Sequence, residues 1–451
     1  MTEQSSKQKQ PVAIFFFTAA LILFATGMLW GIMGALSYVF PGLLKSTFSF
    51  EKIRPLHVSS VVFWIILSAI GSVASFLQQH TGRKIYSPRL LRIQFFIFCI
   101  TIILILCSYL MGKFGGREYW EFHPVFAIPI VIGWILFLIN MLRSIRHFKK
   151  QPVYIWMWCT GIVFFLFTFL ESYLWLFPYF RNNIVNDMTI QWKSYGSMVG
   201  SWNMLIYGSS IFLLDKISGS QRYSYSRIAF LLYFLGLFNL MFNWGHHIYT
   251  LPTHSFIKHI GYLVSMTELI LLGRIIYLWK SSLSTAKKQY HLLAYRFLLA
   301  ADIWILLTLI LAIAMSVPAI NVYTHGTHIT VAHTMGATIG INSFLILAFI
   351  TDIFKDQFPA VKPSLKFFNA GYWIANIALF IFWVSLVGAG ILKAQWQMSE
   401  HQIPFGSMMQ QLHPYFIVFF VSGILLTIGF LFIIFVLLRQ QRNACKQTGE
   451  K

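Results

Sequence analysis

Residues 242–249 read Phe-Asn-Trp-Gly-His-His-Ile-Tyr, which places His246 and His247 side by side in an otherwise apolar run. Burying histidines in a membrane-length apolar segment is costly, so packing alone explains two in succession poorly. Neutral imidazole is a common protein ligand for iron, copper and zinc. The pair therefore predicts a metal site inside a helical membrane bundle. The alternative is that both rings hydrogen-bond at the membrane interface.

The composition supports a membrane environment. The 451 residues are 57% hydrophobic, 18% aromatic and only 10% charged, which is too apolar for a soluble domain of this length. The net charge of +21 comes from short Lys and Arg clusters between apolar runs, a pattern that indicates membrane topology and not a nucleic-acid surface. The four cysteines form neither a CxxC pair nor a CxxCH haem-attachment motif, so no disulfide framework or covalent haem is expected.

Twelve apolar runs are long enough to cross a hydrocarbon core of about 30 Å. We therefore expect an all-α polytopic membrane bundle of about twelve transmembrane helices, forming a single integral domain over residues 1–451. With a cytoplasmic N-terminus, 25 of the 34 Lys and Arg residues lie on the cytoplasmic side, which predicts cytoplasmic tails at 1–11 and 439–451. The runs fall near 12–36, 55–79, 91–112, 125–147, 153–177, 198–216, 227–249, 257–280, 294–316, 329–353, 367–393 and 413–438.

This topology places polar side chains from four helices at one depth, toward the outer side. His57 lies near the outer start of the second run, and Asn203 lies near the outer start of the sixth. The histidine pair lies near the outer end of the seventh run, and His333 near the outer start of the tenth. Several metal-capable groups at one membrane level are costly unless they share a cofactor, so their coincidence favours redox-metal chemistry.

A second motif lies at residues 324–336, which include His325, His328, His333 and Met335. His333 and Met335 are two residues apart and face roughly opposite sides of a helix, so one helix can serve two neighbouring haems. Met is an established axial haem ligand, although packing is the ordinary explanation for a Met in such a position. We interpret His325 and His328 as loop histidines outside the membrane.

Two further side chains are candidates for proton chemistry. Glu268 is a carboxyl group near the middle of the run 257–280, with no basic residue at helical spacing except the distant Arg274. An intramembrane carboxyl group is more often functional than structural, so Glu268 is the candidate last proton donor or iron ligand. Tyr207 lies one turn from Asn203 and could donate a proton or hydrogen bond to a bound oxygen species, with local packing as the simpler interpretation.

Three motifs resemble those of the catalytic subunit of the cytochrome c-dependent nitric oxide reductases, within the haem-copper oxidase superfamily. They are the histidine pair, the His-Gly-Thr followed by Ala-His-x-x-Gly around His333, and Gly-Arg-Glu-Tyr-Trp-Glu at residues 116–121. The resemblance covers essentially all twelve expected helices. It implies a fold like subunit I of the haem-copper oxidases.

The resemblance also implies cofactors and their ligands. It makes His246 and His247 ligands of a non-haem iron, and His333 the proximal ligand of a high-spin haem b. His57 matches the ligand of a low-spin haem b, and Arg54 matches the basic residue near it.

Three further residues have matches in the family. Arg117 would bind haem propionates, and Glu118 matches a carboxylate that helps to hold a structural calcium ion. Glu268 matches the buried glutamate beside the iron.

The sequence departs from the family pattern at three positions. Met335 stands where the family has a second histidine for the low-spin haem, and Asn203 stands where it has a third iron-binding histidine. Tyr207 replaces a second glutamate near the active site. An amide oxygen is a poorer ligand than imidazole, so we expect weaker or altered iron binding.

The resemblance implies the reduction of two nitric oxide molecules to nitrous oxide. Electrons would come from a membrane-anchored cytochrome c subunit, and the protein would lie in the cytoplasmic membrane of a bacterium. Nitric oxide dismutation on the same scaffold is an alternative, because an iron ligand and a glutamate are replaced. Oxygen reduction is a weaker alternative, since few intramembrane carboxylates are present. A non-catalytic haem protein or transporter is disfavoured by the retained histidines and Glu268.

Overall fold

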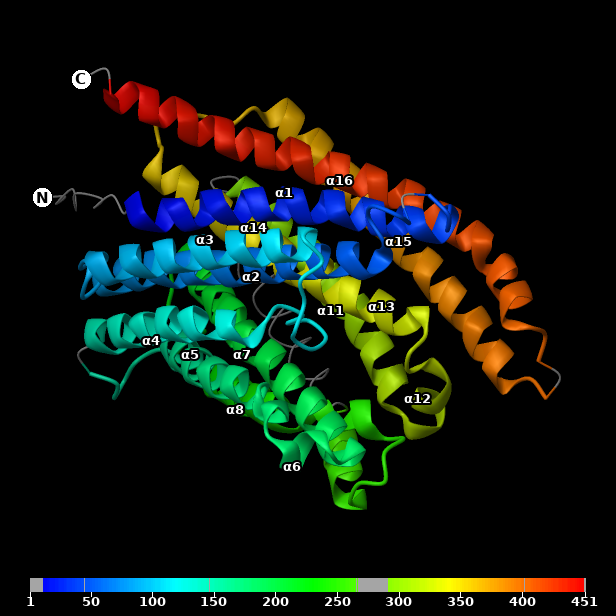
Figure 1. The fold of residues 1–451 in the computed structure, drawn as a ribbon. Coiled ribbons are helices and arrows are strands. Elements are labelled where there is room, and N and C mark those ends of the chain that lie inside the picture. The colour runs from blue at the N-terminus through cyan, green and yellow to red at the C-terminus, as the bar shows by residue number, and fades with distance from the viewer. Residues whose placement is uncertain are drawn as a thin grey trace, which may run out of the picture. The chain divides into compact units, whose positions relative to one another are not determined.

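The structure is a computed structural model that describes residues 11–43, 45–145, 147–264, 266, 291–400 and 402–449 (Figure 1). These residues form helices joined by short connections, and within them β-pairing is limited to one isolated bridge between Arg117 and Trp120. Ten described helical segments are long and apolar enough to cross a membrane. Helices satisfy their own backbone hydrogen bonds, which a lipid environment requires. The expectation of an all-α multi-pass membrane protein is therefore confirmed.

The helices cluster into two compact units. The first combines residues up to Leu136 with Ile346–Phe382 and the chain from Phe416 onward. It contains α1 (Pro11–Val39), α2 (Phe50–Thr81), α3 (Pro88–Leu110), η1 (Pro124–Phe126), the start of α4 (Ala127–Ser144), most of α14 (Phe344–Gln357), the first half of α15 (Leu365–Met398) and most of α16 (Phe405–Gly449).

The second unit comprises Phe137–Leu345 and Trp383–Tyr415. The prediction of one integral domain over the whole chain stays a prediction. The elements of this unit include α5 (Val153–Glu171), η2 (Leu174–Leu176), α6 (Pro178–Arg181), α7 (Ile184–Ser218), α8 (Arg227–Phe242), η3 (Asn243–Ile248), α11 (Leu292–Ser316), α12 (Pro318–Thr324), α13 (His328–Met335) and η4 (Gly336–Ser343).

Every apolar run predicted from the sequence, except 257–280, coincides with a described helix. Most of that run lies in residues 267–290, outside the described residues, and so do Glu268 and Arg274.

The helix at the sixth run is much longer than expected. α7 begins at Ile184 instead of near residue 198, so Asn203 lies in its middle and not near its start. Polar residues lower the hydropathy of the first half without ending the helix. Asn183 caps it by accepting hydrogen bonds from Val185 and Asn186 at 3.0 and 3.2 Å. Lys193 also forms an ion pair with Glu171 of α5.

Two helices change their winding near the predicted ligands. α8 ends at Phe242, and the chain continues as the 3₁₀ helix η3, which carries His246 and His247. α13 ends at Met335 and continues as the π-helix η4. Turns of π-helix inside α-helices are frequent at functional sites, and 3₁₀ stretches often mark them too. Both irregular elements, η3 and η4, lie in the second unit.

Candidate metal centre

The histidine pair is held by a close contact between two backbones. A Cβ added to Gly245 would come within 2.9 Å of the Ile257 carbonyl oxygen and 3.4 Å of the Gly261 Cα, so only glycine permits this approach. The pair follows Gly245 directly on η3. Its ring centroids are 4.2 Å apart with an interplanar angle of 40°. The two rings meet although successive side chains point about 120° apart on a 3₁₀ helix and about 100° apart on an α-helix.

Two more aromatic rings surround His247. The indole of Trp192 on α7 stacks on its imidazole, with centroids 4.6 Å apart and planes within 6° of parallel. The ring of His325 lies 5.9 Å from His247 and 5.8 Å from Trp192. His325 does lie in a loop, between α12 and α13, but it is half-buried against the candidate centre, and burial lowers the pKa of its imidazole.

His333 also lies close to the pair, near enough to His246 for their charges to interact. Its ring hydrogen-bonds to the backbone of Thr308 on α11. A Cβ on Gly336 would lie 2.4 Å from the Thr308 hydroxyl oxygen, so this glycine lets η4 approach α11 closely. The structure therefore places His333 near the histidine pair, while the ligand roles of His246, His247 and His333 stay predictions.

The nitrogen atoms of these rings fit a metal centre. The Nδ1 atoms of His246, His247 and His333 are all buried without a hydrogen-bond partner. Burying an unpaired polar atom costs about 1–3 kcal/mol, which a bound metal would offset. In His333 one ring nitrogen is bonded to the backbone and Nδ1 is left available, which is the usual arrangement of a metal-binding histidine.

The protein ligand set is nevertheless sparse. Among the described residues no group of three His, Cys, Asp or Glu side chains could hold a metal ion. Glu268, the further candidate ligand, lies outside those residues. The donors therefore fit a centre built on the histidine pair that needs at least one other ligand.

Asn203, the candidate replacement for a third histidine, has a specific partner. Its Oδ1 accepts a hydrogen bond from Nδ2 of Asn342 on η4, at 3.1 Å. Asn342 is 2% exposed, and its own Oδ1 is buried without a partner. Asn342 was not predicted as a site residue, because its only signal in the sequence is an amide within the apolar run 329–353.

Asn203 and Tyr207 line the same cavity, which has a volume of about 200 Å³. Its walls come from α5, α7, α8, α11 and η4 and are mostly apolar, with Asn239 and Asp302 among the polar lining residues. A small, largely apolar cavity suits a small uncharged molecule better than an ion. Tyr207 also packs against the apolar cluster that contains Met157, which agrees with the simpler interpretation of this side chain as a packing residue.

The first unit carries a separate candidate ligand, His57 on α2. Its Nδ1 lies 2.7 Å from the carbonyl oxygen of Gly27 on α1. This contact makes Nδ1 the donor and leaves the lone pair on Nε2, the form needed for an axial haem ligand. A Cβ on Gly31 would lie 2.9 Å from Cε1 of His57, so α1 leaves space for this ring.

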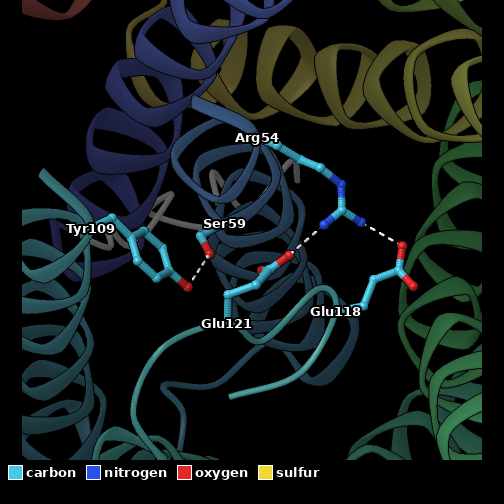
Figure 2. Close-up of polar contacts among 5 residues, drawn as sticks. All are labelled: Arg54, Ser59, Tyr109, Glu118 and Glu121. Carbon is cyan, nitrogen blue, oxygen red and sulfur yellow. Dashed lines mark hydrogen bonds and ion pairs between the residues drawn. The ribbon is translucent and has the colours of Figure 1, made fainter. Parts of the chain in front are cut away.

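Arg54, one turn before His57, joins two carboxylates (Figure 2). Its guanidinium forms an ion pair with Glu118 and donates to Oε1 of Glu121 at 2.9 Å. Both glutamates lie on the connection between α3 and α4, which folds back on itself. Gly116 is required there because a Cβ would lie 1.9 Å from the Trp120 carbonyl oxygen.

The same connection holds titratable groups in unusual environments. Burial raises the pKa of Glu121 from its ordinary value of 4.5, while the nearby charge of Arg54 opposes the shift. Burial and the charge of Glu118 raise the pKa of Tyr119 to about 12. Arg117 forms the β-bridge with Trp120 in this connection. The roles of Arg117 as a propionate ligand, of Glu118 as a calcium ligand and of Met335, the last residue of α13, stay predictions.

Apolar helices that bury histidines with unpartnered ring nitrogens are typical of membrane-bound metalloproteins. Comparison with known proteins specifies the class: residues 11–425 match the family model of cytochrome c and quinol oxidase polypeptide I. The chain belongs to this family of oxidoreductases.

Individual relatives divide between two activities. A nitric oxide reductase subunit of Stutzerimonas stutzeri is 23% identical, over 94% of this chain and 93% of the relative. A cytochrome c oxidase subunit 1 homolog of Agrobacterium tumefaciens is 22% identical, over 89% of this chain and 78% of the relative. A solved haem-copper terminal oxidase dimer shares the fold with a TM-score of 0.72 and 14% identity, over 95% of this chain and 84% of that one. These identities are too similar to decide between the activities.

Proposed function

We propose that this chain is the catalytic subunit of a membrane-bound nitric oxide reductase, which converts two nitric oxide molecules to nitrous oxide and water. The observation that carries the proposal is the cluster of His246, His247 and His333, whose Nδ1 atoms are buried without partners. Similarity to a nitric oxide reductase subunit over almost the whole chain supports it.

The predicted ligands would hold two haems and one non-haem iron. His57 and Met335 would hold the low-spin haem b, and His333 would hold the high-spin haem b. His246 and His247, with Asn203 and Glu268 as further ligands, would hold a non-haem iron. When bound, these groups supply the redox chemistry that delivers two electrons to the paired substrates.

The chain's own side chains would handle substrate and protons. The apolar cavity beside Asn203 would admit nitric oxide and exclude ions, and Tyr207 and Glu268 would donate hydrogen bonds or protons. Arg117 would bind haem propionates, Arg54 would be the basic residue near the low-spin haem, and Glu118 would contribute to a calcium site. We place the protein in a bacterial cytoplasmic membrane with both termini inside. Its electron donor would be a membrane-anchored cytochrome c subunit.

A second candidate function is dismutation of nitric oxide into dinitrogen and oxygen. Asn203 favours it, because an amide shared with Asn342 at 3.1 Å is a weak ligand in place of imidazole. Dismutation consumes no external electrons, so dependence on a donor separates it from reduction. Similarity to cytochrome c oxidase subunits keeps oxygen reduction as a third possibility.

The test uses the purified, haem-loaded protein with a chemical reductant. We expect nitric oxide consumption that requires the reductant and yields nitrous oxide, and we expect His246→Ala to abolish it while haem spectra persist. Nitric oxide consumption without reductant, with dinitrogen and oxygen as products, would establish dismutation. Turnover of oxygen alone would establish an oxidase.

A further inference from the structure

A cavity unrelated to the metal centre lies in the first unit, with a volume of about 280 Å³. This volume is close to the lower end of small-molecule sites, about 300 Å³. One wall is the segment that leads into α15, and the other is the C-terminal part of α16. The lining includes Lys362, Ser364, Phe435, Arg439, Gln440 and Asn443.

The position of this cavity along α16 places it at the edge of the hydrocarbon core. α16 has 45 residues and is therefore about 68 Å long, more than twice the thickness of the core. Its apolar run ends at Leu438, and Arg439 is the first charged residue after it. Phe435 and Asn443 lie one turn before and one turn after Arg439 on the same helix face. The cavity thus combines the exposed apolar side chain of Phe435 with polar side chains at the level where the apolar run ends.

The charge of the cavity is positive. Lys362 and Arg439 are both exposed, and the described residues that line the cavity include no carboxylate. The segment before α15 is fixed beside α16, because Nε2 of Gln440 donates to the Val361 carbonyl at 3.0 Å. Gln440 is only 5% exposed, so this contact is part of the packed structure. Ser364 adds a hydroxyl group at the start of α15, where backbone N–H groups also favour an anion.

We propose that this cavity binds the phosphate group of an anionic phospholipid. Lys362 and Arg439 contact the phosphate, Ser364 and Asn443 donate hydrogen bonds to it or to the headgroup, and an acyl chain begins along Phe435. A choline headgroup would bring its own cation beside Lys362 and Arg439, so a lipid with net negative charge is favoured over phosphatidylcholine. The site is independent of the reaction proposed above.

The test measures lipid retention by native mass spectrometry of the full chain in detergent. Delipidated protein is mixed with phosphatidylglycerol, with phosphatidylcholine or with inorganic phosphate. The K362Q/R439Q double variant is compared with Arg442→Gln, a matched control that removes an exposed cation of the same helix outside the cavity. The thermal midpoint of each variant verifies folding, and Ser364→Ala serves as a milder second change.

We expect wild-type protein and Arg442→Gln to retain phosphatidylglycerol, and K362Q/R439Q to lose about thirtyfold in affinity, from two cations near the surface. Ser364→Ala should weaken retention to a lesser degree. Equal retention by K362Q/R439Q and Arg442→Gln would overturn the proposal. Equal retention of phosphatidylcholine, or displacement of the lipid by inorganic phosphate at matched concentration, would overturn the identification of the ligand as an anionic lipid.

Discussion

Nδ1 of His57 and the backbone carbonyl oxygen of Gly27 lie 2.7 Å apart across the contact between α1 and α2. The hydrogen bond orients the imidazole and leaves Nε2 available, and Gly31 gives the ring its space on α1. The position of the His57 ring, the predicted haem ligand, therefore depends on glycines of a neighbouring helix as well as on the histidine itself.

This relationship predicts that Gly31→Ala disturbs the low-spin haem. The new Cβ would lie 2.9 Å from Cε1 of His57, so the ring must shift at a cost of about 1–3 kcal/mol. We expect weakened or shifted low-spin haem bands in optical and EPR spectra. Gly34→Ala is the matched control, because its Cβ would meet Ile53 at an ordinary 3.5 Å. Identical spectra for Gly31→Ala and Gly34→Ala would contradict the assignment of His57.

The stack between Trp192 and His247 predicts a positioning role for the indole. Trp192→Leu removes a ring that lies 4.6 Å from the imidazole and leaves His247 free to rotate. Loss of an outer partner of a metal ligand typically weakens metal binding about 10–100-fold. We expect a corresponding loss of non-haem iron by elemental analysis, with haem content unchanged. Trp192→Phe keeps an aromatic face and should restore most of the iron, whereas equal iron in Trp192→Leu and wild type would refute the role.

Replacing Asn203 by histidine is predicted to increase the affinity of the centre for iron. Asn203→His supplies the imidazole that the family pattern has at this position, and we expect iron to resist chelators about tenfold better, equivalent to ~1.4 kcal/mol. Asn239→His is the control, because it adds a ring to the same cavity from α8. The measurement is iron retained after dialysis against increasing chelator. Equal retention in the two variants would show that position 203 does not face the metal.

The pKa of Glu121 predicts a pH dependence of stability. Burial raises this pKa above 4.5, so the folded state binds the proton more tightly than the unfolded state does. The resulting stabilisation is fully present below pH 4.5 and is lost as pH rises through the higher folded pKa. Thermal midpoints measured across this window should fall with rising pH in wild type.

Glu121→Gln cannot lose a proton, so its midpoint should lack this component of the pH dependence. The same fall in Glu121→Gln as in wild type would assign the dependence to another group.

The helices could be read from the sequence because lipid imposes length and apolar composition on each span. The runs at 12–36 and 294–316, for example, lie within three residues of the observed ends of α1 and α11. The start of α7 could not be found this way, since Asp187 and Lys193 lower the hydropathy of a segment that stays helical. Its continuation depends on the Asn183 cap and the ion pair with Glu171, neither of which changes the apolar pattern.

The candidate site was easiest to predict where neighbours in sequence carry it. His246 and His247 stand together in the chain, so the pair was visible at once. The places of Trp192 and His325 beside His247 depend on contacts between segments more than 50 residues apart in sequence, which no local pattern encodes. The same is true of Asn342, which reaches Asn203 from the π-helix.

The most direct test of the central claim is the product of isotopically labelled nitric oxide. Reduced, haem-loaded protein is supplied with ¹⁵N-labelled nitric oxide, and the headspace gas is analysed by mass spectrometry alongside His246→Ala. Our account predicts one doubly labelled nitrous oxide for every two nitric oxide molecules and two electrons consumed, with none from the variant. Labelled dinitrogen with oxygen, or no labelled gas from protein with intact haem spectra, would contradict it.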